Sequence, residues 1–176
     1  MKLNSDELKS RLQSGVQFID ESSKNLDELV NLIVNKSCSE LDDYVRYVKA
    51  LLDDETKPIT NLELDDIVMT LPTLLYFASS NQEIVGLRED IAKMTETEAY
   101  NIALQEAEGT VQDKQASAKL QTQNETLTTI VYQRATRQIK ARTESALEVL
   151  QSCKKVLSRR LVEFELSKSS PARNQQ

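Results

Sequence analysis

Residues 130–166, IVYQRATRQIKARTESALEVLQSCKKVLSRRLVEFEL, contain the pattern that decides the fold. Projected at 100° per residue, their apolar side chains fall within a sector about 140° wide, which is one face of a helix. These side chains are Val131, Ala135, Ile139, Ala146, Leu150, Cys153, Val156, Leu157, Leu161 and Phe164. The spacing therefore predicts an amphipathic helix whose apolar stripe is buried, either within the chain or against another subunit.

The composition extends this prediction to the whole chain. Only three glycines, three prolines and 5% aromatic residues occur among the 176 residues, a profile that favours helices over sheets and predicts an all-α protein. Histidine is absent, which removes Ser-His-Asp and Cys-His nucleophile systems and His-containing zinc sites. We expect a protein that is not an enzyme, with no cofactor, no metal site and no small-molecule substrate. Cys38 and Cys153 lie far from any CxxC spacing, so each is expected to be a buried apolar residue.

The first 57 residues have the pattern of a small N-terminal helical module. Ser5, followed by two acidic residues, is a helix start, and a further helix is predicted to begin near Ser37. Pro58 and the acidic residues before it indicate a linker. We therefore predict a module at 1–57, separable from the rest.

Residues 61–166 predict a long antiparallel helical hairpin. Thr60 and Glu63 have the spacing of a capping box, and Gly109 followed by Thr110 and Asp113 predicts a tight turn between two helices. The helix before that turn carries a row of apolar residues: Ile84, Leu87, Ile91, Met94, Ile102 and Ala103. The remaining residues, 167–176, lack apolar anchors and are expected to form a disordered tail.

Two adjacent aromatic residues, Tyr76 and Phe77, follow Pro72 in the first half of this hairpin. Aromatic side chains mostly serve packing, so we expect them in the core at a helix junction. The alternative is that they are platforms on which nucleic-acid bases stack.

Charge is distributed unevenly along the chain. Residues 1–133 carry 12 basic and 24 acidic side chains, whereas residues 134–176 carry 10 basic and 4 acidic ones. Such a chain can bind polyanions at its basic end, or it can pair its own two ends head to tail.

Five basic residues share the helix face opposite the apolar stripe, in a sector about 120° wide. They are Arg134, Arg137, Lys140, Lys155 and Arg159. A shared outward face is what phosphate contact requires, so they are the candidate nucleic-acid-binding residues. Glu144 and Glu148 interrupt this face, and the alternative is an ordinary solvated surface with i, i+4 ion pairs. Arg142 and Arg160 instead project into the apolar stripe, where they can reach a subunit boundary or pair with acidic residues.

The order of features in residues 71–166, from LPTLLYFASSNQEIVGLREDIAKM through a glycine turn to a second long helix, resembles the bacteriophage recombination-mediator (UvsY-like) family. Lys140, Ala141 and Arg142 match that family's Lys-Ala-Arg element, which is associated with DNA contact. The resemblance implies a homo-oligomer that binds single-stranded DNA and acts with a recombinase or a single-strand-binding protein, and it adds Arg142 to the candidate DNA-binding residues.

Two functional hypotheses follow. The first is a non-enzymatic oligomeric helical protein of phage type that binds single-stranded DNA, a recombination mediator by resemblance. The second is a helical adaptor or scaffold that assembles through helix–helix contacts. No apolar run approaches the ~18 residues of a membrane span and the first ten residues lack an apolar signal region, so we expect no membrane contact and a cytoplasmic location, in the host cytoplasm if the protein is phage-encoded.

Overall fold

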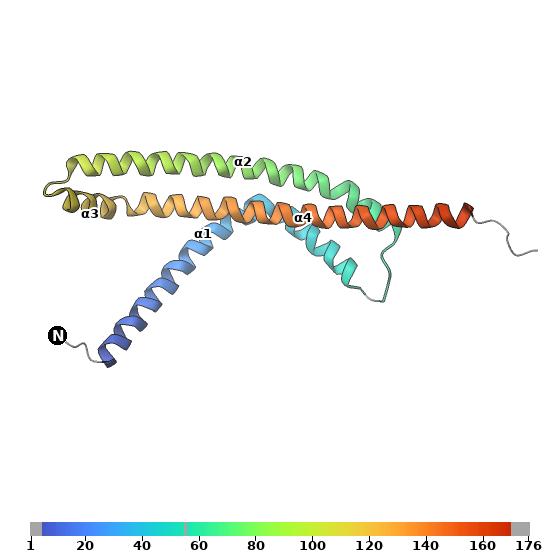
Figure 1. The fold of residues 1–176 in the computed structure, drawn as a ribbon, viewed down its shortest axis with the longest axis horizontal. Coiled ribbons are helices and arrows are strands. Elements are labelled where there is room, and N and C mark those ends of the chain that lie inside the picture. Colours follow the sequence, from blue (N-terminus) through green and yellow to red (C-terminus); the bar gives the residue numbers. More distant parts are fainter. Residues whose placement is uncertain (1–4, 55, 170–176) are drawn as a thin grey trace, which may run out of the picture. The chain divides into compact units, whose positions relative to one another are not determined.

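A computed structural model describes residues 5–54 and 56–169, with side chains described at 16, 20, 21, 23–54 and 56–168. These residues form four helices and no strand: α1 (Ser5–Asp53), α2 (Asn61–Glu106), α3 (Val111–Gln121) and α4 (Gln123–Ser169) (Figure 1). The predicted all-α class is confirmed. Within this part of the chain, no helix combines the length and the apolar character that crossing a membrane requires.

α1 is a single helix, so the predicted break near Ser37 is wrong. The apolar spacing continues without interruption through that position, because Val34, Cys38 and Leu41 are all buried and lie four and three residues apart. A serine inside such a pattern does not end a helix when its neighbours keep one face buried.

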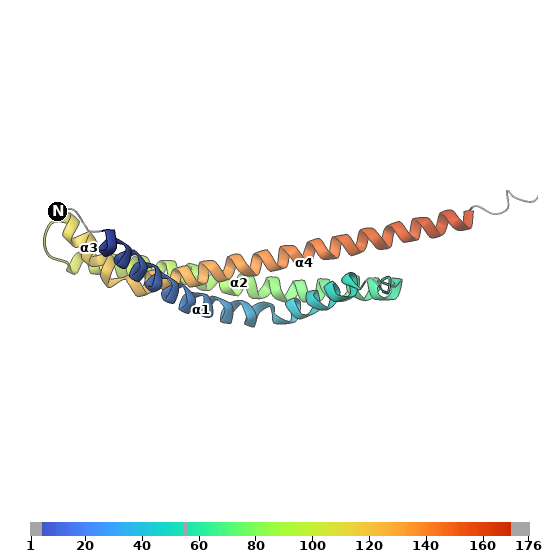
Figure 2. The same cartoon turned by 90° about the horizontal axis from the view of Figure 1, so that it is seen from below.

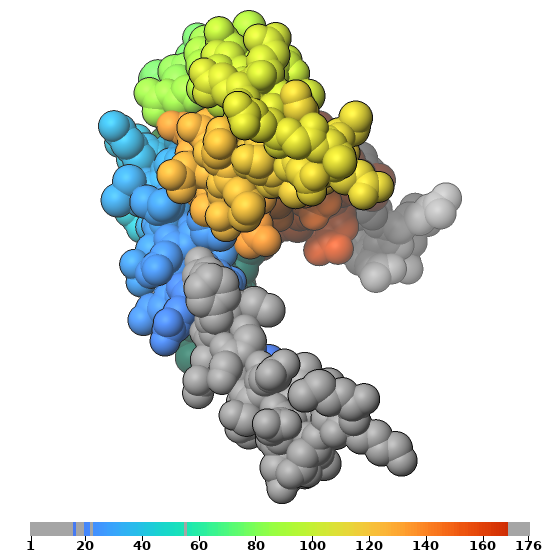
Figure 3. Space-filling model, turned by 90° about the vertical axis from the view of Figure 1, so that its left-hand side faces the viewer, coloured from blue at the N-terminus to red at the C-terminus, as the bar shows by residue number. Residues whose placement is uncertain are grey.

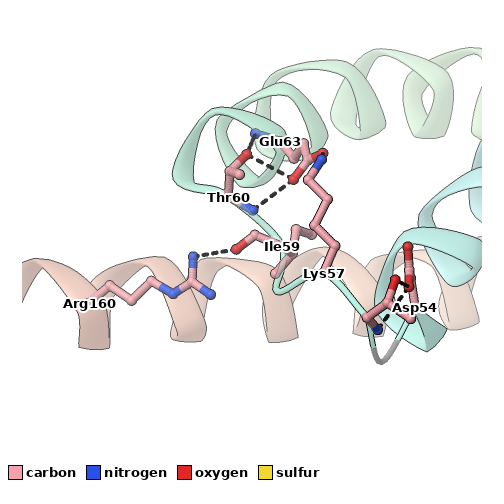
Figure 4. A network of polar contacts seen from close by, with 7 residues as sticks. Asp54, Lys57, Ile59, Thr60, Glu63 and Arg160 are labelled. Carbon is pink, nitrogen blue, oxygen red and sulfur yellow. Dashed lines mark hydrogen bonds and ion pairs between the residues drawn. The ribbon is translucent and has the colours of Figure 1, made fainter.

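α2 begins with the predicted capping box. The Glu63 carboxylate accepts hydrogen bonds from the backbone N–H (2.7 Å) and the hydroxyl (2.8 Å) of Thr60, whose hydroxyl oxygen accepts from the Glu63 N–H at 3.2 Å (Figure 4). Lys57 adds an ion pair to Glu63 at 3.1 Å. Pro72 lies inside α2 without ending it, although its ring nitrogen cannot donate to the preceding turn.

The turn between α2 and α3 also forms as predicted. Gly109 has φ of 107°, a conformation that glycine adopts without steric cost, and Thr110 and Asp113 form a reciprocal capping box at the start of α3. α3 is separated from α4 by Thr122 alone, whose N–H still donates to the Ala118 carbonyl oxygen at 3.0 Å. Figure 3 shows α3 packed against the first turns of α4 and the last turns of α2.

The chain divides into two compact units, and α1, α2 and α4 each contribute residues to both. Unit 1 combines residues 1–36 with 85–137, and unit 2 combines residues 37–84 with 138–176. Each unit thus brings together segments that are distant in the sequence.

In unit 1, the second half of α2 packs against α3 and the start of α4 (Figures 1 and 2). The Thr126 hydroxyl donates to the Glu96 carboxylate at 2.7 Å and ties α4 to α2. Small and β-branched side chains form the buried core: Val30, Val34, Val85, Ala103, Ala107, Ala118, Val131 and Ala135.

In unit 2, residues 37–53 of α1, the first half of α2 and the second half of α4 form a three-helix arrangement. Asn81 Nδ2 donates to the Ser37 carbonyl oxygen at 3.1 Å and the Tyr44 hydroxyl donates to Asp66 at 3.0 Å, so α1 and α2 are antiparallel here. The core consists of Cys38, Leu41, Val48, Leu64, Ile67, Leu71, Ala78, Ile139, Ala146, Leu150 and Cys153. The tail predicted for residues 167–176 falls largely outside the described residues, and α4 itself continues to Ser169.

Candidate functional site

Two of the candidate DNA-binding residues, Arg134 and Arg137, lie in unit 1. The Arg134 guanidinium is 3.5 Å from the Asp27 carboxylate of α1, and both side chains are largely exposed. Arg137 is exposed and has no ion pair within the described residues. The pKa of Glu89 lies below its ordinary value mainly because the Lys93 ammonium binds it, and the charge of Arg137 contributes to the same shift. Arg137 therefore already lies in the field of an acidic neighbour.

In unit 2, Lys140 and Arg159 form the i, i+4 pairs of the alternative interpretation. Lys140 Nζ is 3.9 Å from Glu144, and Arg159 Nε is 3.5 Å from Glu163. All four side chains are solvent-exposed, so each pair contributes only a few tenths of a kcal/mol and opens at little cost. Lys155 is exposed and has no ion pair in the part of the chain that the structure describes.

Arg142 and Arg160 bind groups within unit 2. Arg142 donates to the Asp42 carboxylate of α1, and the two side chains are 31% and 26% exposed. Arg160 donates to the Ile59 carbonyl oxygen at 2.8 Å (Figure 4). It also donates to Asn61 Oδ1 at 2.9 Å, so it fixes the start of α2. Both arginines lie where the stripe projection placed them, and their contacts give them a structural role.

The apolar stripe of α4 is covered along only part of its length. In unit 2, Leu150 is 4% exposed, whereas Leu161 and Phe164 are 56% and 57% exposed. The stripe is no longer buried after Arg160, which contacts Asn61, the first residue of α2. The later turns of α4 extend past the start of α2, so α2 does not cover them (Figures 1 and 2). Phe164 has one ring face covered by Lys168, whose Nζ is 4.3 Å from the ring centroid.

α2 carries a second uncovered apolar feature, the row of apolar residues seen in the sequence before the glycine turn. In unit 1, Leu87, Ile91, Met94 and Ile102, which we call the outward row, are 49% to 72% exposed. The residues that pack inward occupy the opposite face and are mostly smaller: Val85, Ala92, Ala99 and Ala103. The sequence pattern identified the helix from its large apolar residues. It did not reveal that the small residues on the opposite face are the ones that pack inward in unit 1.

Tyr76 and Phe77 are exposed, so the prediction that they belong to the core is wrong. Tyr76 is 71% and Phe77 is 55% exposed, and their rings contact each other edge to face at 5.5 Å between centroids. Leu62 and Met69, on the same half of α2, are also exposed. Leu71 and Ala78, which carry smaller or branched side chains, take the inward positions.

Residues 61–84 of α2 contain Glu63, Asp65, Asp66 and Glu83 and no lysine or arginine. The exposed aromatic pair therefore lies on a helix segment, residues 61–84, with a net charge of −4. Phosphate groups are repelled by such a surface, which disfavours the base-stacking alternative for Tyr76 and Phe77.

A polar hollow in unit 1 lies between α2, α3 and the start of α4, with Lys93, Tyr100, Lys119 and Thr129 in its lining. Lys93 is bound by Glu89 at 2.6 Å and the hollow contains no nucleophile–base pair among its lining residues. The Thr129 hydroxyl is buried without a partner, a group that one water molecule can satisfy.

The cysteines are buried, as predicted, and burial raises the pKa of both thiols. Across residues 5–54 and 56–169, no three Cys, Asp or Glu side chains come together in a way that could hold a metal ion. Comparisons with protein-family models, with curated proteins and with solved structures find no match to this chain.

Proposed function

We propose that this chain is a non-enzymatic cytoplasmic helical assembly protein, which acts through helix–helix contacts with other copies of itself and with partner proteins. The observation that carries the proposal is the outward row of α2, four large apolar side chains on the face opposite the one that unit 1 buries. Contiguous exposed apolar surface of this kind marks protein–protein contacts. Leu87, Ile91 and Met94 also have the four-and-three spacing with which one helix fits its side chains between those of another.

The magnitude of the burial supports a contact of this kind. Fully burying one large apolar side chain contributes about 1.5–3 kcal/mol, so completing the burial of four half-exposed ones contributes on the order of 5 kcal/mol. When an apolar partner surface contributes as much again, the sum is comparable with the ~4–15 kcal/mol cost of association. The outward row can therefore sustain a specific but moderate interaction.

The proposal is tested by the mass of the chain in solution. Light scattering across a concentration series is expected to give a mass above the 19.9 kDa of one chain. Ile91→Glu places a charge in the outward row and is expected to lower that mass at a given concentration. Gln115→Glu, which adds the same charge at an exposed position of α3, serves as the control and is expected to leave it unchanged. A 19.9 kDa particle at every concentration contradicts the proposal.

A second candidate function is the binding of single-stranded DNA by the assembled protein, as a recombination mediator that acts with a recombinase or a single-strand-binding protein. The resemblance over residues 71–166 supports it, and so does one feature of α4. Lys155 is exposed without an ion pair within the described chain, and Lys140 and Arg159 are held only by long exposed pairs. Such cations can exchange a carboxylate for a phosphate at little cost, and several copies would multiply the effect.

Fluorescence anisotropy with a labelled oligothymidine tests this candidate. Binding at low salt is expected to weaken as salt rises, and Lys155→Gln combined with Arg159→Gln is expected to reduce the slope of log K against log salt by about 0.7 for each lost phosphate contact. Lys49→Gln, an exposed substitution on α1, is the matched control. The absence of binding at low salt by the oligomeric protein rules the DNA candidate out and leaves the assembly proposal intact.

A further inference from the structure

Unit 2 carries two uncovered apolar surfaces whose charges are opposite. The first, the acidic α2 face, consists of Leu62, Met69, Tyr76 and Phe77, with the acidic residues of 61–84 around them. The second, the basic α4 end, consists of residues 154–168, with Leu161, Val162 and Phe164 exposed among five basic and two acidic residues. The net charges are −4 and +3.

We propose that the basic α4 end of one copy docks on the acidic α2 face of a second copy. This inference rests on the proposed assembly function and adds to the outward row of α2 a second contact between copies, made by unit 2. The complementary charges select this pairing, because two acidic faces or two basic ends brought together would repel each other.

The α4 end of the same chain cannot cover the acidic α2 face. Arg160 is bound to Ile59 and Asn61 at the start of α2, and α4 continues beyond that point as an unbroken helix to Ser169. Residues 161–168 therefore extend away from the first turn of α2 (Figures 1 and 2). The acidic α2 face lies on the other side of α2 from its buried residues, such as Leu64 and Leu71.

The two surfaces fit in shape and chemistry. Leu62, Met69 and Tyr76 are seven residues apart, so they form one line with about 10.5 Å between neighbours at 1.5 Å per residue. Leu161 and Phe164 are three residues apart on one face of α4 and can pack along this line. Met69 and the aromatic pair are suited to such a contact, since a thioether and ring edges adapt to an incoming phenyl ring.

The charges also set the direction of the contact. Asp65 lies four residues before Met69 in α2, and Lys154 lies seven residues before Leu161 in α4, so each charge shares the helix face of its apolar neighbour. Lys155 and Arg159 lie on the opposite face of α4 and take no part in this contact. A parallel alignment therefore brings Lys154 toward Asp65 and Met69 next to Leu161. Since the two surfaces differ, the contact is either reciprocal between two copies or continues head to tail into a ring or filament.

Disulfide trapping between two single-cysteine additions tests the contact in the full-length protein. Met69→Cys and Leu161→Cys proteins are purified separately, mixed, allowed to exchange and oxidised. The mixture is expected to give a linked dimer on a non-reducing gel, in at least tenfold excess over either protein alone. Cys38 and Cys153 are buried and are not expected to compete.

Glu163→Cys is the matched control for Leu161→Cys. Glu163 is exposed only two residues away but lies on the opposite side of α4, so its mixture with Met69→Cys is expected to give little linked dimer. Equal linkage at 163, or none at 161, overturns the contact.

Charge exchange supplies an independent readout. Lys154→Glu is expected to weaken self-association roughly tenfold through like-charge repulsion, and Asp65→Lys in the same chain is expected to restore it. A double variant weaker than the single one contradicts the pairing. These outcomes are separable from those of the assembly proposal: a wild-type oligomer without linkage between 69 and 161 rejects this contact alone, whereas a wild-type monomer rejects assembly itself.

Discussion

Arg142 shows how one side chain can be placed correctly by its sequence pattern and still have a different role. Helical projection puts it within the apolar stripe of α4, and the structure has it bound there to the Asp42 carboxylate of α1. An arginine with a buried stem and a paired head is a structural residue, so the tripeptide match to a DNA-contacting element does not describe its contacts.

Replacing Arg142 with Met is expected to destabilise the chain by about 1–3 kcal/mol, because the Asp42 carboxylate would lose its partner at a largely buried position. Arg46→Met is the control, since its pair with Asp43 is exposed on both sides and contributes less than about 0.5 kcal/mol. Urea unfolding followed by circular dichroism measures both. Equal losses for the two variants would contradict the structural role of Arg142.

Glu63 makes the capping of α2 sensitive to pH. The Thr60 backbone N–H first, then the Thr60 hydroxyl and Lys57, lower the pKa of Glu63 from 4.5 to about 2. Because the folded-state pKa is the lower one, the stabilisation is complete above pH 4.5 and is lost as the pH falls toward 2.

Glu63→Gln is therefore expected to be less stable than the wild type at pH 7, with a difference that narrows as the pH falls from 4.5 toward 2. Urea unfolding at several pH values measures that difference. A deficit that stays constant over this range would show that the charge of Glu63 does not stabilise the helix start.

At the scale of the elements, Gly86 inside α2 and Gly109 in the turn after it have opposite roles. Gly109 has φ of 107°, and a Cβ there would lie 3.2 Å from Asp113 Cβ, whereas a Cβ at Gly86 meets nothing within 4 Å. Gly109→Ala is expected to destabilise by about 1–2 kcal/mol. Gly86→Ala is expected to stabilise by about 0.5–1 kcal/mol, because alanine orders the helix interior at a lower entropic cost.

Thermal or urea unfolding of the two alanine variants compares them directly. The pair controls for the substitution itself, since both change glycine to alanine. A change of the same sign at both positions would contradict the assignment of Gly109 as the obligatory turn residue.

The element boundaries were predictable where local chemistry decides them. The two capping boxes and the Gly109 turn each depend on residues within four positions of one another. All three form at the positions that the sequence predicted. The inward face of α2 was not predictable from its own pattern. That helix has large apolar residues on one side and small ones such as Ala103 on the other, and the choice between them depends on which neighbouring helix can approach closely.

For the same reason the candidate site could be predicted only in part. The exposure of Lys155 follows from its position on one helix face. The ion pairs that Lys140 and Arg159 form with glutamates four residues later follow from the same spacing. The partners of Arg142 and Arg160 lie about 100 residues away in the chain, so no local rule could identify them.

At the scale of the whole molecule, each compact unit is assembled from separate stretches of the sequence. Residues 37–53 of α1 contribute Cys38, Leu41 and Val48 to the core of unit 2, which also contains residues 61–84 and 138–169. Burial of this apolar face of α1 stabilises the helix more than the intrinsic helix propensity of its residues does.

A fragment of residues 1–57 is therefore expected to be largely unfolded in dilute solution, although the sequence suggested a separable module. Residues 58–176 are expected to retain helix but to unfold at a lower urea concentration than the whole chain, with recovery when the two fragments are mixed. Circular dichroism of the fragments, alone and together, checks this. Cooperative unfolding of 1–57 on its own would show that the module is independent.

The placement of the two cysteines has a consequence for observing local opening. Both thiols are buried, both belong to unit 2, and unit 1 contains none. A thiol reagent can react only when the surrounding helices separate, so its rate under native conditions reports transient opening of unit 2 without any introduced label. A contact on the outer surface of unit 2 that slows this opening would protect both thiols. The contact would then be detected as a lower rate of thiol modification.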